Sequence, residues 1–212
     1  MKKKSVLIVV DLQNDFVTGG NLAVKDGEKI VDVVNNLLPK FDLVIFTQDW
    51  HPENHKSFAS QHEGKNPFDV IDLNGINQCL WPDHCVQNTP GADLLSTIDF
   101  GKIKDKFYIF KKGLDIEVDS YSGFYDNNSK NSTGLAEFLN EQAVSDVFVC
   151  GLALDYCVAY TAIDATMEAF NTTVVIDATK SIGDITEALM NFKEAGVKVI
   201  ESWELDLFKL TN

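Results

Sequence analysis

The sequence predicts an α/β protein of three layers, in which helices cover both faces of a six-stranded, mostly parallel sheet. Six short apolar runs alternate with helical patterns or long crossovers, and this alternation is typical of parallel sheets. The first run is wholly apolar and rich in β-branched residues, as expected of a central strand that is buried on both faces. The runs lie at 6–10, 43–47, 107–110, 146–150, 172–176 and 197–201.

Helices are expected where apolar residues recur every three or four positions. In the segment 27–38, Ile30, Val34 and Leu37 fall on one face, which would pack on the sheet. The other expected helices are a short one at 91–95 and longer ones at 134–143, 156–170 and 186–195.

The composition indicates one globular domain spanning residues 1–212. A formal net charge of −14 and the lack of a basic patch argue against nucleic-acid binding, because the phosphate backbone would be repelled. No apolar run is long enough to span a bilayer, and the run after Met1–Lys4 is too short for a signal peptide. We therefore expect a cytoplasmic protein whose four cysteines stay reduced.

The turn between the strand 146–150 and the helix 156–170 is a candidate for the catalytic centre. Gly151 ends the strand, and Cys157 then falls in the first turn of the helix. The unpaired N–H groups and the positive dipole end of a helix favour a thiolate, so we expect a lowered thiol pKa. The alternative is that Cys157 is a small buried apolar residue, like most cysteines of cytosolic domains.

Charged residues follow two other predicted strands. Asp11 ends the first strand, at the sheet edge where ligands bind in open α/β folds. Lys111 and Lys112 end the strand 107–110, and a lysine there could keep an aspartate ionised. Neighbouring residues on a strand point to opposite faces, so only one of the two lysines can face Asp11, and both could simply be solvated.

The region from about 48 to 90 is rich in Pro, Asn, Gly and His and shows little periodicity, so we expect a long functional loop. Asp49 and the loop histidines form an Asp/His/His combination that suits zinc or ferrous iron. His51 and His55 are four positions apart, but Pro52 argues against a helical metal-binding pair. The alternative is a solvated polar loop.

Six sequence blocks resemble the signatures of nicotinamidases, which belong to the isochorismatase-like hydrolase superfamily. The Asp, Lys and Cys blocks mark the superfamily, whereas Asp-Trp-His-Pro and Trp-Pro-Asp-His-Cys point to the nicotinamidase branch. The blocks occupy 10–16, 48–52, 81–87, 112–113, 119–124 and 151–158, in the family's order.

The resemblance implies a catalytic role for three residues. Asp11 would be the base, Cys157 the nucleophile and Lys112 the supporting cation. Lys112 is preferred to Lys111 because the family's lysine directly precedes a glycine, here Gly113. The implied reaction converts nicotinamide to nicotinate and ammonia, as part of NAD salvage, and also pyrazinamide to pyrazinoate.

The resemblance also implies the substrate-binding residues. Phe16 and Trp81 would flank the ring, with Tyr121 beside them. The backbone N–H groups of Ala153 and the nucleophile would form an oxyanion hole, and the bond between Leu152 and Ala153 would be a cis peptide.

The family's metal site implies one divalent ion bound by Asp49, His51 and His84. Zn2+ is expected, with Fe2+ and Mn2+ as alternatives. His55 is a ligand in some family members only, and is therefore expected in the second sphere.

Two other functions stay open. A related hydrolase of the same fold could act on another small amide or on isochorismate, although the metal loop and Trp81 argue against both. The chain could also be a catalytically silent metal-binding protein. The sequence leaves the oligomeric state open, and a homo-oligomer is compatible with it.

Overall fold

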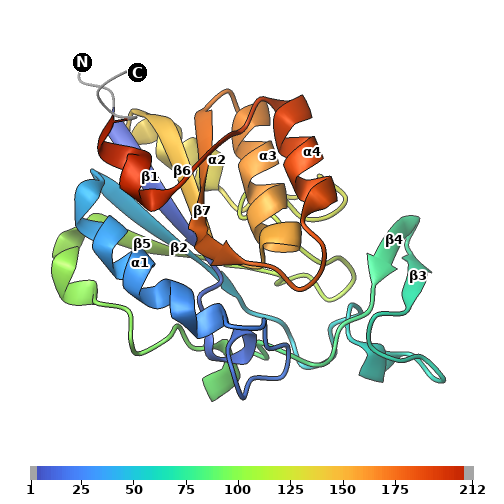
Figure 1. Ribbon diagram of the computed structural model, residues 1–212. Helices are drawn as coiled ribbons and strands as arrows, with labels where there is room; N and C mark the ends of the chain where they lie inside the picture. The colour runs from blue at the N-terminus through green and yellow to red at the C-terminus, as the bar shows by residue number, and fades with distance from the viewer. Residues whose placement is uncertain (1–3, 208–212) are drawn as a thin grey trace.

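The computed structural model describes residues 4–207 and has helices on both faces of a central sheet (Figure 1). The strands lie in the order β5-β2-β1-β6-β7-β8, and all neighbours are parallel. They are β1 (Lys4–Val10), β2 (Leu43–Asp49), β5 (Phe107–Lys112), β6 (Val144–Leu152), β7 (Asn171–Lys180) and β8 (Lys198–Ile200). The predicted α/β fold is therefore confirmed. Residues 1–3 and 208–212, at the ends of the predicted domain, lie outside the described residues.

The two faces of the sheet are covered by different helices. Alternate residues of β1 point to opposite faces, so that Leu7 and Val9 join one apolar cluster and Ile8 and Val10 the other. Each such fully buried aliphatic side chain contributes about 1.5–3 kcal/mol to stability. The first cluster packs under α1 (Val31–Leu37), and the second under α2 (Leu135–Glu141), α3 (Ala159–Met167) and α4 (Thr186–Ala195).

The structure departs from the predicted helices at 91–95. Only a 3-10 turn forms there, at Pro90–Ala92. The backbone of the following residues instead bonds to the segment after β1, where the N–H of Asn14 donates to the carbonyl of Asp93 at 3.0 Å. Leu94 also forms an isolated antiparallel bridge with Gln13. Pairing with this segment leaves no free backbone for a helix.

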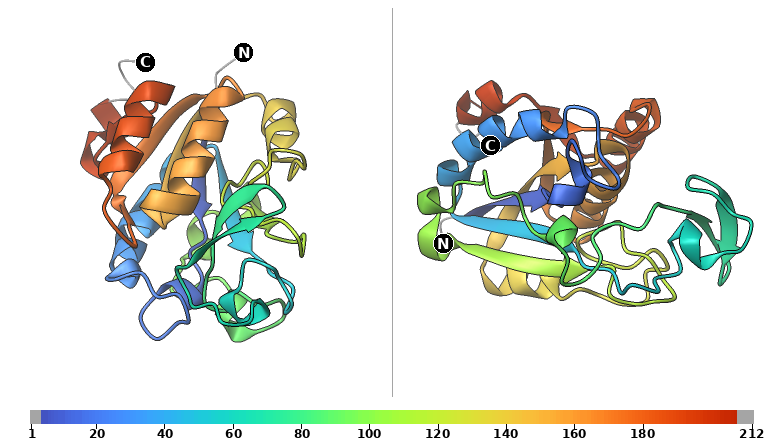
Figure 2. Two further views of the ribbon diagram at one scale, coloured as in Figure 1. Left: turned by 90° about the vertical axis from the view of Figure 1, so that its right-hand side faces the viewer. Right: turned by 90° about the horizontal axis from the view of Figure 1, so that it is seen from below.

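The loop region 48–90 contains a hairpin that the sequence analysis did not predict. Its strands are β3 (Val70–Leu73) and β4 (Ile76–Cys79), which pair antiparallel with one another and not with the central sheet. Asn74 and Gly75 form the connection, and Asn-Gly is a strong signal for a tight hairpin turn. The hairpin projects beyond the carboxyl ends of β1 and β2 (Figure 2).

The sheet order places a topological switch point at β1, which has β2 on one side and β6 on the other. In open α/β sheets, ligands bind at such a point, outside the carboxyl ends of the strands. The functional residues should therefore lie at this edge.

Candidate functional site

Four neighbouring strands bring the predicted catalytic and metal-binding residues together. Asp11 directly follows β1, whereas Asp49 and Lys112 are the last residues of β2 and β5 and are register partners. Cys157 lies in a π-helical turn, Leu154–Val158, that follows β6 and leads into α3. Since β5, β2, β1 and β6 are consecutive in the sheet, the four side chains meet at one edge.

Lys112 is the centre of this cluster. Its Nζ lies 2.6 Å from Oδ1 of Asp49, 2.9 Å from Oδ2 of Asp11 and 3.5 Å from Sγ of Cys157. The ammonium also donates to the carbonyl of Ser120 at 2.9 Å. Lys111, on the opposite face of β5, instead places its Nζ 3.5 Å from the ring centre of Trp50. The structure therefore places Lys112, and not Lys111, beside the aspartates.

The two aspartates respond differently to this environment. Burial raises the pKa of Asp11 to about 6, even though Lys112 opposes the shift. Burial also acts on Asp49, but Lys112 and His51 outweigh it and hold the pKa of Asp49 well below its usual range. Asp11 is therefore the carboxylate that can take up a proton near neutral pH, which suits a general base.

The backbone of Asp11 is held in an uncommon conformation. Its φ of 47° lies in the left-handed region, which residues other than glycine rarely adopt. The hydroxyl of Thr47 donates to Oδ1 of Asp11 at 2.6 Å, and the N–H of Asp11 donates to that hydroxyl oxygen at 3.1 Å. These bonds leave Oδ2 to face Lys112.

The expected lowering of the Cys157 pKa is not found. Burial raises the pKa of this thiol well above its ordinary value, and Lys112 only partly offsets the effect. Cys157 is 8% exposed, so the loss of hydration outweighs the position at a helix start. The resting group is therefore a thiol that needs a base, and Asp11 carries a carboxylate oxygen within 4.8 Å of Sγ. The bond between Leu152 and Ala153 is cis, as the resemblance implies.

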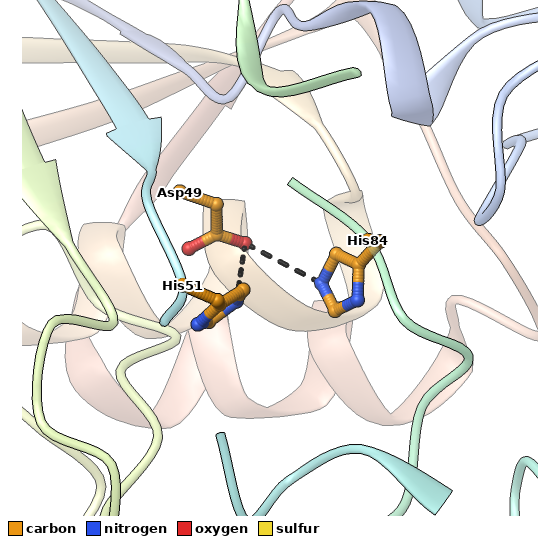
Figure 3. Close-up of side chains that lie close together, drawn as sticks. All are labelled: Asp49, His51 and His84. Atoms are coloured by element: carbon orange, nitrogen blue, oxygen red, sulfur yellow. Dashed lines mark ion pairs between the residues drawn. The ribbon is translucent and has the colours of Figure 1, made fainter. Parts of the chain in front are cut away.

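The three predicted metal ligands converge from β2 and two loop segments (Figure 3). The Nε2 atoms of His51 and His84 lie 3.6 and 3.7 Å from Oδ2 of Asp49. Backbone pairing brings the two loops together, because the N–H of His51 donates to the carbonyl of Cys85 at 3.0 Å. Backbone hydrogen bonds like those between parallel strands thus bring the two histidines together, although they are far apart in the sequence.

The donor set fits a divalent ion. Nδ1 of His51 lies 3.0 Å from the carbonyl of Gly113, and Nδ1 of His84 lies 2.8 Å from that of Pro82. A carbonyl only accepts, so both Nδ1 atoms carry hydrogen and both Nε2 atoms present a lone pair in the neutral rings. Nε2 of His51 is buried and has no hydrogen-bond partner among residues 4–207. Two imidazoles and a carboxylate suit zinc or ferrous iron.

Comparison with known proteins places this cluster in a family. The model of the isochorismatase domain matches residues 5–204. The chain belongs to the isochorismatase family. It is 46% identical to a nicotinamidase of Acinetobacter baylyi over 199 residues, which cover 92% of each protein.

Solved structures of the isochorismatase family agree with this assignment. A nicotinamidase/pyrazinamidase of Acinetobacter baumanii has a TM-score of 0.92 and 41% identity, covering 97% of this chain and 99% of its own. A pyrazinamidase of Pyrococcus horikoshii, in complex with zinc, has a TM-score of 0.76 and 36% identity over 93% of this chain and 99% of its own. The suspected resemblance is therefore confirmed.

Within residues 4–207, no helix is long and apolar enough to cross a membrane.

Two residues of the first isochorismatase-family block, which the sequence analysis left without a role, hold the ligand loops. Gln13 donates from Nε2 to the carbonyl of Asp49 and accepts from its N–H, both at 2.8 Å. Asp15 accepts from the N–H of Cys85 at 2.7 Å, next to His84. The sequence feature that could have identified both residues is their position in the block 10–16.

His55 is buried beside the metal-binding residues, with its ring centre 4.4 Å from that of His51. Its Nδ1 accepts from the N–H of Ser57 at 3.2 Å and lies 2.7 Å from the hydroxyl of that serine. Its Nε2 is buried and has no hydrogen-bond partner in the described part of the chain, and burial lowers the pKa of the ring to about 4. His51, His55 and Asp119 form a second group of candidate ligands, of which the sequence analysis missed Asp119.

A cavity of about 20 Å3 lies beside the nucleophile. The predicted residues Phe16, Trp81 and Tyr121 line it together with Cys157. Leu152 and Ala153 are buried and are not among the lining residues. The other lining residues are Leu22, Asp49, His84, Asp119 and Tyr156.

A larger cleft of about 560 Å3 also borders Tyr156, which among the described residues is the one that lines both spaces. The cleft runs along α3 and α4, and Cys157 does not face it. The smaller cavity therefore holds the candidate chemistry.

Proposed function

We propose that the chain is a metal-containing cysteine amidohydrolase that converts nicotinamide to nicotinate and ammonia in NAD salvage, and that it also converts pyrazinamide to pyrazinoate. We also propose that residues 1–212 form one catalytic domain with a metal-binding loop at about 48–90. The observation that carries this proposal is the contact of Lys112 with Asp11, Asp49 and Cys157, which joins the catalytic residues to the metal-binding residues. The nicotinamidase relatives support the choice of substrate.

The first half of the reaction forms a thioester. Asp11 takes the proton of the Cys157 thiol, and the sulfur attacks the carboxamide carbon. The N–H groups of Ala153 and Cys157 stabilise the negative oxygen of the tetrahedral intermediate, and each such donor is worth about 3 kcal/mol. The C–N bond then breaks, and the leaving nitrogen takes the proton from Asp11 to become ammonia.

The second half releases the acid. Water enters in place of ammonia, and Asp11 accepts one of its protons while the oxygen attacks the thioester carbon. The C–S bond breaks, the proton passes from Asp11 to sulfur, and nicotinic acid leaves and loses its remaining proton to water as nicotinate. Lys112 holds Asp11 in its charged form between these steps, because its ammonium contacts the carboxylate directly.

The metal would be held by Asp49, His51 and His84, with Zn2+ expected and Fe2+ or Mn2+ as alternatives. When bound, the ion would accept the lone pair of the pyridine nitrogen and so orient the ring. Phe16 and Trp81 would pack against the ring faces, in a cavity whose walls are largely aromatic.

Substrate range tests this proposal. Nicotinamide and pyrazinamide carry a ring nitrogen meta to the carboxamide, whereas benzamide has the same shape and no nitrogen. Misplacing the reacting carbon by about 1 Å costs about a hundredfold in rate, so benzamide should have a kcat/KM lower by that factor. All three amides are measured on one metal-loaded preparation. Comparable values for benzamide and nicotinamide would contradict orientation by the metal, and the absence of nicotinate formation would contradict the assigned reaction.

A further inference from the structure

The cavity beside Cys157 is too small for the proposed substrate. Its volume of about 20 Å3 has room for about one water molecule, which needs roughly 10–15 Å3 of such space. A pyridine ring with a carboxamide is several times larger. At least one wall of the cavity must therefore move outward when the ring enters.

The hairpin β3–β4 leads directly into one of these walls, because Trp81 follows β4 by two residues. The hairpin pairs only with itself, and an isolated two-stranded hairpin is at best marginally stable in water. Of the side chains in its two strands, Gln78 alone is buried. The buried contact that docks the strands of this hairpin is therefore polar, and at its turn Nδ2 of Asn74 also donates to the carbonyl of Glu117, at 3.3 Å.

The Gln78 side chain is fully engaged with the segment that follows β5. Its Nε2 donates to the hydroxyl oxygen of Tyr121 at 2.9 Å and to the backbone carbonyl of Cys79 at 2.7 Å. The same nitrogen lies 3.3 Å from Oδ2 of Asp119, and Oε1 accepts from Asn127 at 3.4 Å. A carbonyl and a carboxylate both accept only, so their positions fix which end of the amide is the nitrogen.

Tyr121 connects this docking contact to the substrate cavity. Its hydroxyl oxygen accepts from Gln78 and also from the indole N–H of Trp81, at 3.2 Å. Trp81 in turn packs edge-on against Tyr156, with ring centres 4.8 Å apart. These three aromatic side chains all line the cavity. The hydroxyl group of Tyr121 thus joins the hairpin to the aromatic walls of the cavity.

We propose that Gln78 is a positioning residue for the substrate ring. It docks the hairpin on Tyr121 and thereby holds Trp81 and Tyr121 in their ring-binding positions, while its release lets the cavity widen for entry. This inference rests on the proposed function for the identity of the ring. Docking of the hairpin also controls how accessible Cys157 is to a reagent, so it can be measured without turnover of a substrate.

The first test replaces Gln78 by methionine, which keeps the length of the side chain and removes its hydrogen bonds. Loss of a buried hydrogen bond costs about tenfold in an equilibrium, so the KM for nicotinamide should rise about tenfold while kcat stays within about twofold. Asn77→Ala, at an exposed neighbouring position of β4, is the matched control and should leave both constants unchanged. An unchanged KM for Gln78→Met, or a loss confined to kcat, would overturn the proposal.

The second test follows alkylation of Cys157 by iodoacetamide, read from the Cys157 peptide by mass spectrometry. Without substrate, Gln78→Met should react about tenfold faster than the parent protein, because the hairpin opens more often. An equal rate would overturn the proposal. This readout needs no hydrolysis, so it decides the role of Gln78 even if nicotinamide proves not to be the substrate.

A double-mutant cycle tests the coupling to Tyr121. Tyr121→Phe removes the same hydrogen bond from its other end and should raise KM and the alkylation rate by a similar factor. If both changes act through one bond, the KM and the alkylation rate of the double variant should be no higher than those of the more affected single variant. Multiplicative effects would refute the shared contact. Because Tyr121→Phe lies outside the hairpin, it also gives the answer should Gln78→Met fold poorly.

Discussion

Replacing Lys112 by methionine should destabilise the protein and inactivate it. Lys112 is 2% exposed, and its ammonium lies between two buried carboxylates, at 2.9 Å from Asp11 and 2.6 Å from Asp49. Removing one partner of a buried ion pair costs about 3–5 kcal/mol, since the remaining charge is left without compensation. In the metal-free protein we therefore expect the free energy of unfolding to fall by about 3–5 kcal/mol. Activity should fall by at least about a hundredfold, because Asp11 would be protonated at neutral pH.

The pH dependence of this loss identifies its cause. Without Lys112, burial should raise the pKa of Asp11 further above the value of about 6 that it has in the parent protein. A carboxylate whose folded pKa exceeds its unfolded pKa destabilises the fold while ionised, and this penalty shrinks once the pH falls below the folded pKa and is gone below the unfolded pKa. The gap in stability between parent and variant should thus narrow from pH 8 towards pH 5.

Urea unfolding of chelator-treated protein, followed by fluorescence, measures the effect. Lys111→Met is the matched control. It removes a lysine from the next position of β5, where the ammonium stacks on Trp50, and should cost about 1 kcal/mol or less. If Lys112→Met unfolded with the parent free energy, or if its loss were independent of pH, the buried charge cluster would not be the source of the effect.

The other predictions concern the metal, the nucleophile and the base. His51→Ala and His84→Ala should lose the divalent ion, about one per chain in the parent protein, whereas His55→Ala should retain it, as measured by elemental analysis. Cys157→Ala should abolish turnover while the protein still folds and binds nicotinamide, as measured by calorimetry. Finally, kcat/KM should reach its plateau well above pH 6 and fall towards a slope of about tenfold per pH unit below it, because Asp11, with a pKa of about 6, must be ionised to accept the thiol proton.

Each of these predictions has an outcome that would contradict it. Active protein without metal would rule out the ligand set, and loss of the ion from His55→Ala would make that residue a ligand. More than trace activity in Cys157→Ala would exclude the covalent route. If kcat/KM and bound metal fell together over the same acidic pH range, the loss of activity would be due to protonation of the metal ligands and not of Asp11.

The fold could largely be predicted from the sequence because its strong signals are local. The wholly apolar run of β1 predicts a central parallel strand, and the rule for strand ends then locates Asp11 and Lys112. The hairpin β3–β4 was missed although Asn74 and Gly75 carry its turn signal, because the flanking strands have only four residues each. Short strands offer too few positions for a clear alternation.

Details of the site depended on packing that no local pattern encodes. The burial of the turn decides whether the pKa of Cys157 is raised or lowered, and the sequence shows only that a helix begins nearby. Gln13 and Asp15 act through backbone groups of Asp49 and Cys85, which reach them only after the sheet and the loops have assembled. Their roles therefore required the three-dimensional structure.

The shared contact of Lys112 makes the two halves of the site thermodynamically reciprocal. One ammonium group contacts both the carboxylate that would bind the metal, on Asp49, and the carboxylate that would move the proton, on Asp11. Any change of charge at one carboxylate redistributes the attraction of Lys112 for the other. Linkage then requires that the proton affinity of Asp11 depend on occupancy at Asp49, and that ion affinity at Asp49 depend equally on the protonation of Asp11.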